Sequence, residues 1–80
     1  MDIQLIQEEF SSNDAIEIIT QLVHLKIKYH ENKINSHSSE DDIKTREAKI
    51  KRLQKGLFEL RKKINSKTNG VKVEAIIRIE

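Results

Sequence analysis

The sequence predicts a mainly α-helical protein, at the margin of the α+β class. Two helices form an antiparallel coiled-coil hairpin, and short N- and C-terminal β-strands pair at one end of it. We expect this chain to be part of a homo-oligomer. Two long segments carry apolar residues at helical spacing, a polar stretch separates them, and apolar residues alternate near both ends. Charged residues make up 35% of the 80 residues and proline is absent, which favours long helices over a sandwich or barrel. We treat residues 1–80 as a single domain.

An N-terminal β-strand is predicted at residues 2–6. Met1, Ile3 and Leu5 occupy alternate positions, as in a strand with one buried face, but Ile6 interrupts that alternation. A lone strand cannot satisfy its own backbone N–H and C=O groups, so this segment needs a partner strand.

The first helix is predicted over residues 13–33, because Ser11 and Asp14 have the spacing of a helix cap. Its apolar residues form two adjacent stripes. Stripe A contains Ala15, Ile18, Leu22, Leu25 and Tyr29, and stripe B contains Ile16, Ile19, Val23, Ile27 and Ile34. One partner helix cannot cover so wide an apolar arc. We expect the second helix to cover stripe A and a second chain to cover stripe B, since a monomer rarely exposes such a patch.

A polar connection at residues 34–39 leads to the second helix, predicted over residues 40–67. Ser39 and Asp42 repeat the cap spacing, and the acidic residues that follow suit the positive end of a helix dipole. Apolar residues then recur with the heptad period that predicts a left-handed coiled-coil seam. The seam contains Ile43, Ile50, Leu53, Leu57, Leu60 and Ile64, with Arg46 as its polar break.

Two glycines bear on the shape of this second helix. Gly56 lies in its middle, where glycine costs about 1 kcal/mol relative to alanine. Close approach of another backbone would explain Gly56, and so would neutral drift. At the end of the helix, Gly70 or Asn69 is expected to adopt the left-handed conformation that closes helices.

The C-terminal residues predict a β-strand at 71–79 with one buried face. Its alternate positions are apolar, and the antiparallel helices bring it to the same end as strand 2–6. Two strands alone are marginal, so we expect the strands of a second chain to complete a four-stranded sheet. The predicted core and oligomer interface consists of Ile16, Ile19, Val23, Ile27, Ile43, Ile50, Leu53, Leu57, Leu60, Ile64, Val73 and Ile77.

The charge is strongly asymmetric. Residues 1–42 carry nine acidic side chains against three basic ones, whereas residues 43–67 carry ten basic against two acidic. An antiparallel hairpin brings these halves together, so most of the basic charge is expected to face the protein's own acidic half or solvent. The alternative is a nucleic-acid interface on the outer face of the second helix, with phosphate contacts from Lys49, Arg52, Lys55, Lys62 and Lys63.

Catalytic and metal sites find little support in the sequence. His24, His30 and His37 do not have the spacing of a ligand set, and cysteine is absent, so we expect no metal and no cofactor. There is no glycine-rich phosphate loop and no nucleophile motif, and we therefore predict that the protein is not an enzyme.

These observations favour a small structural or adaptor module that self-associates as a homodimer or higher assembly and presents a helical surface to another protein. The alternative function is a small nucleic-acid-binding regulator. No segment approaches the roughly 18 uninterrupted apolar residues of a membrane span, so no membrane is expected and the predicted location is cytoplasmic. The abundance of Ile, Lys and Asn is typical of a bacterial or phage protein.

Overall fold

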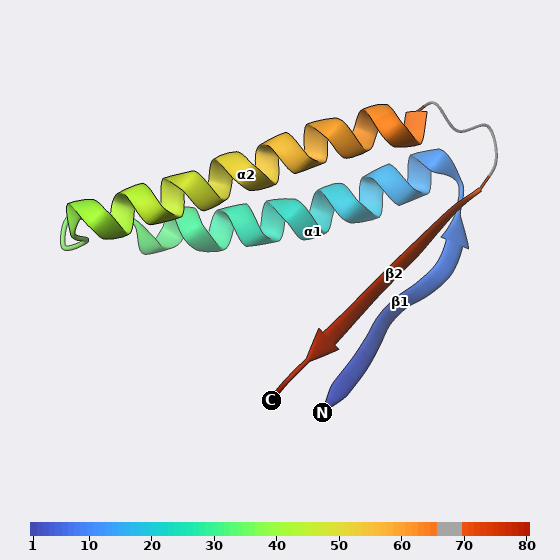
Figure 1. Cartoon of the computed structure of the whole chain (residues 1–80), viewed down its shortest axis with the longest axis horizontal. Coiled ribbons are helices and arrows are strands. Elements are labelled where there is room, and N and C mark those ends of the chain that lie inside the picture. Colours follow the sequence, from blue (N-terminus) through green and yellow to red (C-terminus); the bar gives the residue numbers. More distant parts are fainter. Residues whose placement is uncertain (66–69) are drawn as a thin grey trace.

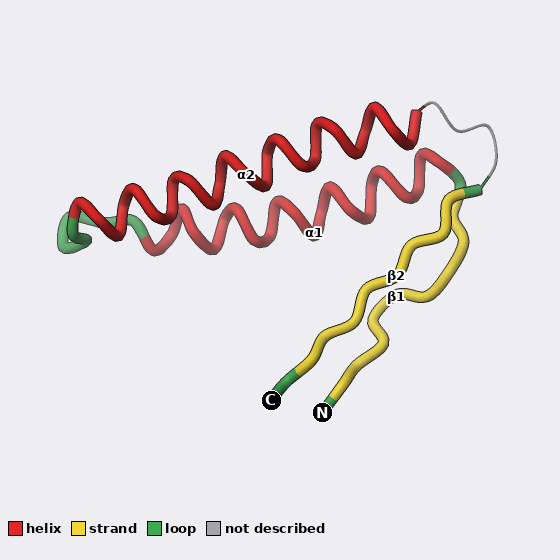
Figure 2. The backbone as a smooth tube through the Cα atoms, in the orientation of Figure 1, coloured by secondary structure: helices red, strands yellow, loops and turns green. Residues whose placement is uncertain are grey.

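The computed structural model describes residues 1–65 and 70–80, which form a helical hairpin and a two-stranded ribbon (Figure 1). The elements, in chain order, are β1 (Asp2–Phe10), α1 (Ser12–Lys33), α2 (Glu40–Asn65) and β2 (Val71–Arg78). The helices run antiparallel, and the strands pair antiparallel in a ribbon that leaves one end of the hairpin at an angle (Figure 2). This arrangement confirms the predicted fold class, a helical hairpin with terminal strands.

The element boundaries differ from the predicted ones mainly in β1. This strand continues past residue 6 to Phe10, because its whole length finds partners along β2. The predicted end of the second helix at residue 67 lies outside the described residues. Both predicted helix caps form: the Ser11 hydroxyl accepts the backbone N–H of Asp14 at 3.2 Å, and the Ser39 hydroxyl accepts that of Asp42 at 3.1 Å.

A β-bulge explains why alternation fails in the N-terminal segment. Gln4 pairs with Ile76 and Ile6 with Ala75, so Leu5 is an extra residue in β1. Leu5 and Ile6 consequently both line the groove that faces α1. The Gln4 side chain amide donates to the Ile6 carbonyl at 2.8 Å and so satisfies a backbone group at the bulge.

The core lies where the base of the ribbon meets the hairpin. Ala15 is completely buried there, together with Ile64 of α2 and Val71 of β2. Partly buried apolar side chains surround this cluster, namely Phe10, Ile16, Ile19, Leu60 and Val73. Each of the four elements therefore contributes to one small core, and the same apolar face of the ribbon continues outward beyond it.

The prediction that α2 covers stripe A of α1 is wrong beyond Ala15, which is buried in the core, since α2 covers stripe B along the rest of α1. Ile27 is buried, and Ile16 and Ile19 pack on the core cluster, whereas Leu22 and Leu25 are 38% and 69% exposed. The residues Ile16, Ile19, Val23 and Ile27 thus lie within the chain rather than at the surface predicted for a second chain. The four-stranded sheet across two chains stays a prediction.

Stripe B includes a buried polar residue. His30 is buried, and it lies three residues after Ile27 and four before Ile34. With His30 included, stripe B becomes a continuous seam with steps of three or four residues from Ile16 to Ile34. The apolar residues alone do not reveal this continuity.

The left-handed conformation expected at Gly70 does not occur. Gly70 does not have a positive φ, and its Cα lies under the side chain of Glu9, while Asn69 lies outside the described residues. Gly56 is exposed, and a Cβ built on it would find no atom within 4 Å. Among residues 1–65 and 70–80, no other backbone segment therefore approaches Gly56.

Replacing Gly56 by alanine should stabilise the protein by about 1 kcal/mol, because alanine loses less backbone entropy in a helix and meets no neighbour here. The measurement is urea unfolding followed by circular dichroism. A lower stability of G56A would contradict the reading of Gly56 as an open helical position.

Candidate functional site

A polar pair, of which His30 is buried and Arg46 partly exposed, interrupts the apolar seam between the helices. His30 of α1 is only 4% exposed, and its Nδ1 lies 3.1 Å from Nη1 of Arg46 in α2. A guanidinium group can only donate, so Nδ1 accepts and the proton of the neutral imidazole is on Nε2. Among the described residues, the Nε2 atom has no hydrogen-bond partner although it is buried. The seam thus contains an N–H donor that no described group accepts.

Positive charge surrounds this histidine. Burial is the largest cause that lowers the pKa of His30 below its ordinary value of 6.5, and the charges of Lys49, Arg46 and Lys26 lower it further. The neutral form is therefore favoured in the folded protein.

His30 also lines a shallow groove between the two helices, which we call the basic groove. Its other lining residues are Lys26 of α1 and Lys49, Arg52 and Leu53 of α2. The ring of Tyr29 lies beside that of His30, with centroids 5.5 Å apart. Three cationic side chains and one buried imidazole therefore converge on a single groove, and no acidic residue lines it.

The five residues predicted for a nucleic-acid interface do not share one surface. Lys49 and Arg52 line the basic groove, whereas Lys55, Lys62 and Lys63 are exposed outside it. At about 100° per residue, Lys55 and Lys62 lie roughly 120° and 140° around the helix axis from Lys49. Lys62 instead lies over the ring of Phe58, 4.5 Å from its centroid. Sequence reasoning missed Lys26, His30 and Arg46 as members of the site.

The predicted attraction between the acidic and basic halves takes a different form. Arg61 of the basic segment donates to the Thr20 hydroxyl of α1 at 3.2 Å. Exposed ion pairs join Lys44 to Glu40 at 3.3 Å and Arg78 to Asp2 at 3.5 Å, within α2 and across the ribbon. Neither of these pairs crosses between the helices, and exposed pairs of this kind add little stability.

The second notable surface is apolar and lies between the ribbon and α1. Leu5 and Ile6 of β1 line one wall, and Ile18, Leu22 and Leu25 of stripe A line the other together with Glu17 and Gln21 of α1. We call this surface the apolar wedge. It continues along exposed side chains of Ile3 and Ile77 on the ribbon and Tyr29 on α1.

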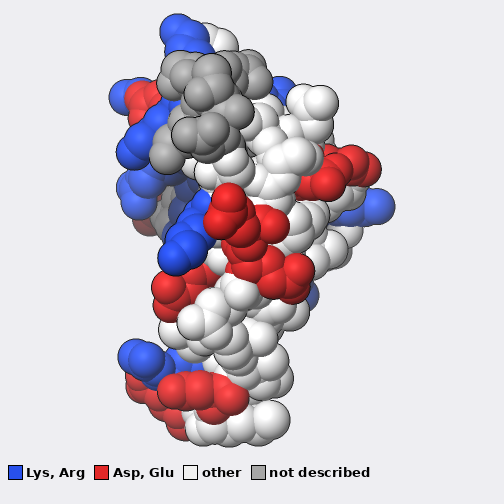
Figure 3. Space-filling view, turned by 90° about the vertical axis from the view of Figure 1, so that its right-hand side faces the viewer, with Lys and Arg blue, Asp and Glu red and all other residues white. Residues whose placement is uncertain are grey.

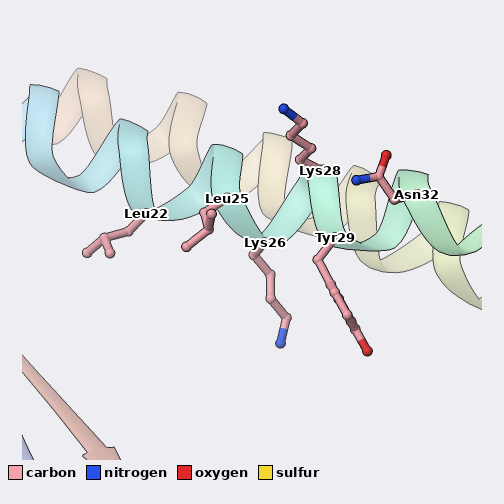
Figure 4. A pocket seen from close by; sticks show the side chains of 6 residues that line it. All are labelled: Leu22, Leu25, Lys26, Lys28, Tyr29 and Asn32. Atoms are coloured by element: carbon pink, nitrogen blue, oxygen red, sulfur yellow. The ribbon is translucent and has the colours of Figure 1, made fainter.

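The figures show how this apolar surface is exposed. Leu22, Leu25 and Tyr29 point from α1 toward the side on which the ribbon lies, whereas Lys28 and Asn32 point the other way (Figure 4). From the end where ribbon and hairpin join, uncharged side chains cover much of the molecule, with acidic groups across the middle and basic groups along one edge (Figure 3).

The described part of the chain contains neither a cluster of metal ligands nor a membrane-spanning helix. Among residues 1–65 and 70–80, no three His, Asp or Glu side chains come together in a way that could hold a metal ion. His24 and His37 are both exposed, whereas His30 is buried. The two described helices each lack the length and apolar character needed to cross a bilayer.

Comparison with known proteins gives no further indication of function. No protein-family model matches the chain, and the searches of curated proteins and of solved structures found no similar protein.

The lowered pKa of His30 predicts that folding stability decreases as the pH falls below about 7, because the unfolded chain then binds a proton that the folded chain excludes. Replacing His30 by glutamine, which keeps an acceptor for Arg46, should reduce this loss. Thermal unfolding between about pH 7.5 and pH 5.5 measures it.

The matched control is His24→Gln, since His24 is exposed on the same helix. This variant should keep the pH dependence of the wild-type protein. If H30Q and the wild-type protein lose the same stability over this range, His30 is not the group that titrates.

Proposed function

We propose that this protein is a non-enzymatic structural or adaptor module that acts as a homodimer held together through the apolar wedge. The observation that carries this proposal is the continuous apolar surface shared by the ribbon and stripe A. Leu5 and Ile77 are 47% and 42% exposed on the ribbon, and Leu25 and Tyr29 are 69% and 52% exposed on α1.

The ribbon itself supports a need for association. A two-stranded sheet is marginally stable in water, and this ribbon packs on the helices through Val71, Val73 and Phe10 at its base, with Ile6 also buried beside α1. Farther out, the same face carries Ile3 and Ile77 without cover from the hairpin. A chain of this length buries only about 60% of its unfolded surface when it folds alone. Burial of this face against a second copy would therefore contribute a large share of the free energy of unfolding.

A second copy of this chain fits the wedge because the two walls are complementary to each other. The ribbon already packs its apolar face at its base, where Phe10 and Val73 pack on the same core cluster as Ile16 and Ile19 of α1. In a twofold dimer, the outer ribbon of each copy packs in the same way on stripe A of the other copy. Each wall then occurs twice in the interface, once from each copy, as an isologous interface requires.

Such a dimer leaves the opposite flank of the hairpin exposed. That flank includes Phe58 and Lys62 of α2 and His24 and Lys28 of α1. The assembly would thus present two helical surfaces to a protein partner, which is the adaptor role that we propose.

Light scattering coupled to size-exclusion chromatography tests the proposal. The wild-type protein should elute with the mass of two chains, and Leu25→Glu should shift it to one chain by placing a charge in the apolar wedge. Leu25 is mostly exposed within one chain, so L25E should keep its helical circular dichroism signal.

The matched control is His24→Glu, which adds a negative charge to the same helix at an exposed position that lies with Gln54 and Phe58 and does not line the wedge. H24E should remain a dimer. A wild-type protein that has the mass of one chain at every concentration would rule out self-association as its function.

A further inference from the structure

We propose that the basic groove is a binding site for a phosphate group, in which the Nε2–H of His30 donates a hydrogen bond to a phosphate oxygen and Lys26, Lys49 and Arg52 balance its charge. This site is separate from the apolar wedge, and it does not depend on dimer formation.

The hydrogen-bonding state of His30 supplies the first argument. Arg46 donates a hydrogen bond to Nδ1 of His30. The proton of the neutral ring is therefore on Nε2, which is a buried donor. Buried donors in folded proteins almost always have an acceptor. None of the described groups accepts from Nε2, which has almost no accessible surface, so an anion bound in the groove would supply the missing acceptor once a neighbouring side chain moves aside.

The charges around the groove supply the second argument. Lys26 from α1 and Lys49 and Arg52 from α2 line it, and no acidic residue does. Arg46 adds a fourth positive charge through its contact with His30, and the combined charge depresses the pKa of that histidine. Like charges held this close repel one another, and a bound anion removes that repulsion.

The combination of groups favours phosphate over a carboxylate. The groove offers three positive charges and one imidazole donor, and a phosphate group brings more negative charge and more acceptor oxygens than a carboxylate. The planar guanidinium of Arg52 suits two phosphate oxygens at once. Free phosphate, a nucleotide and a nucleic-acid backbone all carry this group, so the experiment must separate them.

The test follows the His30 imidazole signals by nuclear magnetic resonance while inorganic phosphate is added. Sodium chloride at equal ionic strength serves as the reference, because general screening affects both salts alike. Phosphate should give a saturable shift of His30 that chloride does not give. Equal responses to phosphate and chloride would overturn the proposal.

Variants on α2 provide the matched comparison. The double variant Lys49→Gln, Arg52→Gln should weaken phosphate binding by about tenfold or more, since it removes two charge-assisted contacts. Lys51→Gln, Lys55→Gln makes the same change in net charge at exposed positions outside the groove and should bind as the wild-type protein does. Equal weakening by both double variants would mean that general surface charge attracts phosphate, which contradicts a defined site.

Two further probes identify the source of the phosphate group. A nucleoside monophosphate that shifts His30 more strongly than inorganic phosphate would indicate a small ligand. A short single-stranded oligonucleotide that binds tightly, and loses binding in the Lys49, Arg52 variant with steep salt dependence, would indicate a nucleic-acid backbone. The L25E variant should bind phosphate like the wild-type protein, so a failed dimer and a failed phosphate site give different results.

Discussion

The small core around Ala15 is the contact on which the rest of the molecule depends. It joins α1 to Ile64 of α2 and Val71 of β2, and Phe10 of β1 packs against it. Because Ala15 has only a methyl group and is completely buried, the ribbon approaches both helices closely at this point. The far end of the hairpin and the outer ribbon extend away from it in different directions (Figure 1). A chain anchored at one place in this way keeps much of its apolar surface in the open.

The two surfaces that we assign to function meet at one residue. Lys26 lines the basic groove with His30, and it also lines a hollow with Leu22, Leu25 and Tyr29 of stripe A. Figure 4 shows its side chain on the same side of α1 as these apolar residues. A second copy seated in the wedge would therefore lie beside the phosphate site. The two surfaces are therefore neighbours in space, although the dimer and the phosphate site are tested independently.

The sequence predicts this fold well where the pattern is local and poorly where a polar residue or a bulge takes part. Caps at Ser11 and Ser39 and the heptads of α2 follow from short-range spacing and chain chemistry. The bulge at Leu5 could not be predicted from the sequence. Its two consecutive apolar residues interrupt the alternation expected of a strand. The basic groove was missed for a related reason: Lys26 and Lys49 come from different helices, and only the register of the hairpin brings them together.

The His30–Arg46 contact fits the register in which the hairpin is closed. The short connection between α1 and α2 limits how far the helices can slip, and within that limit Arg46 of α2 lies beside His30 of α1. A single polar position is known to specify register in coiled coils at some cost in stability. Arg46 also fixes the tautomer of His30, because it holds Nδ1 as the acceptor and directs the proton to Nε2. The contact between the helices therefore leaves His30 with the Nε2–H donor on which the proposed phosphate site depends.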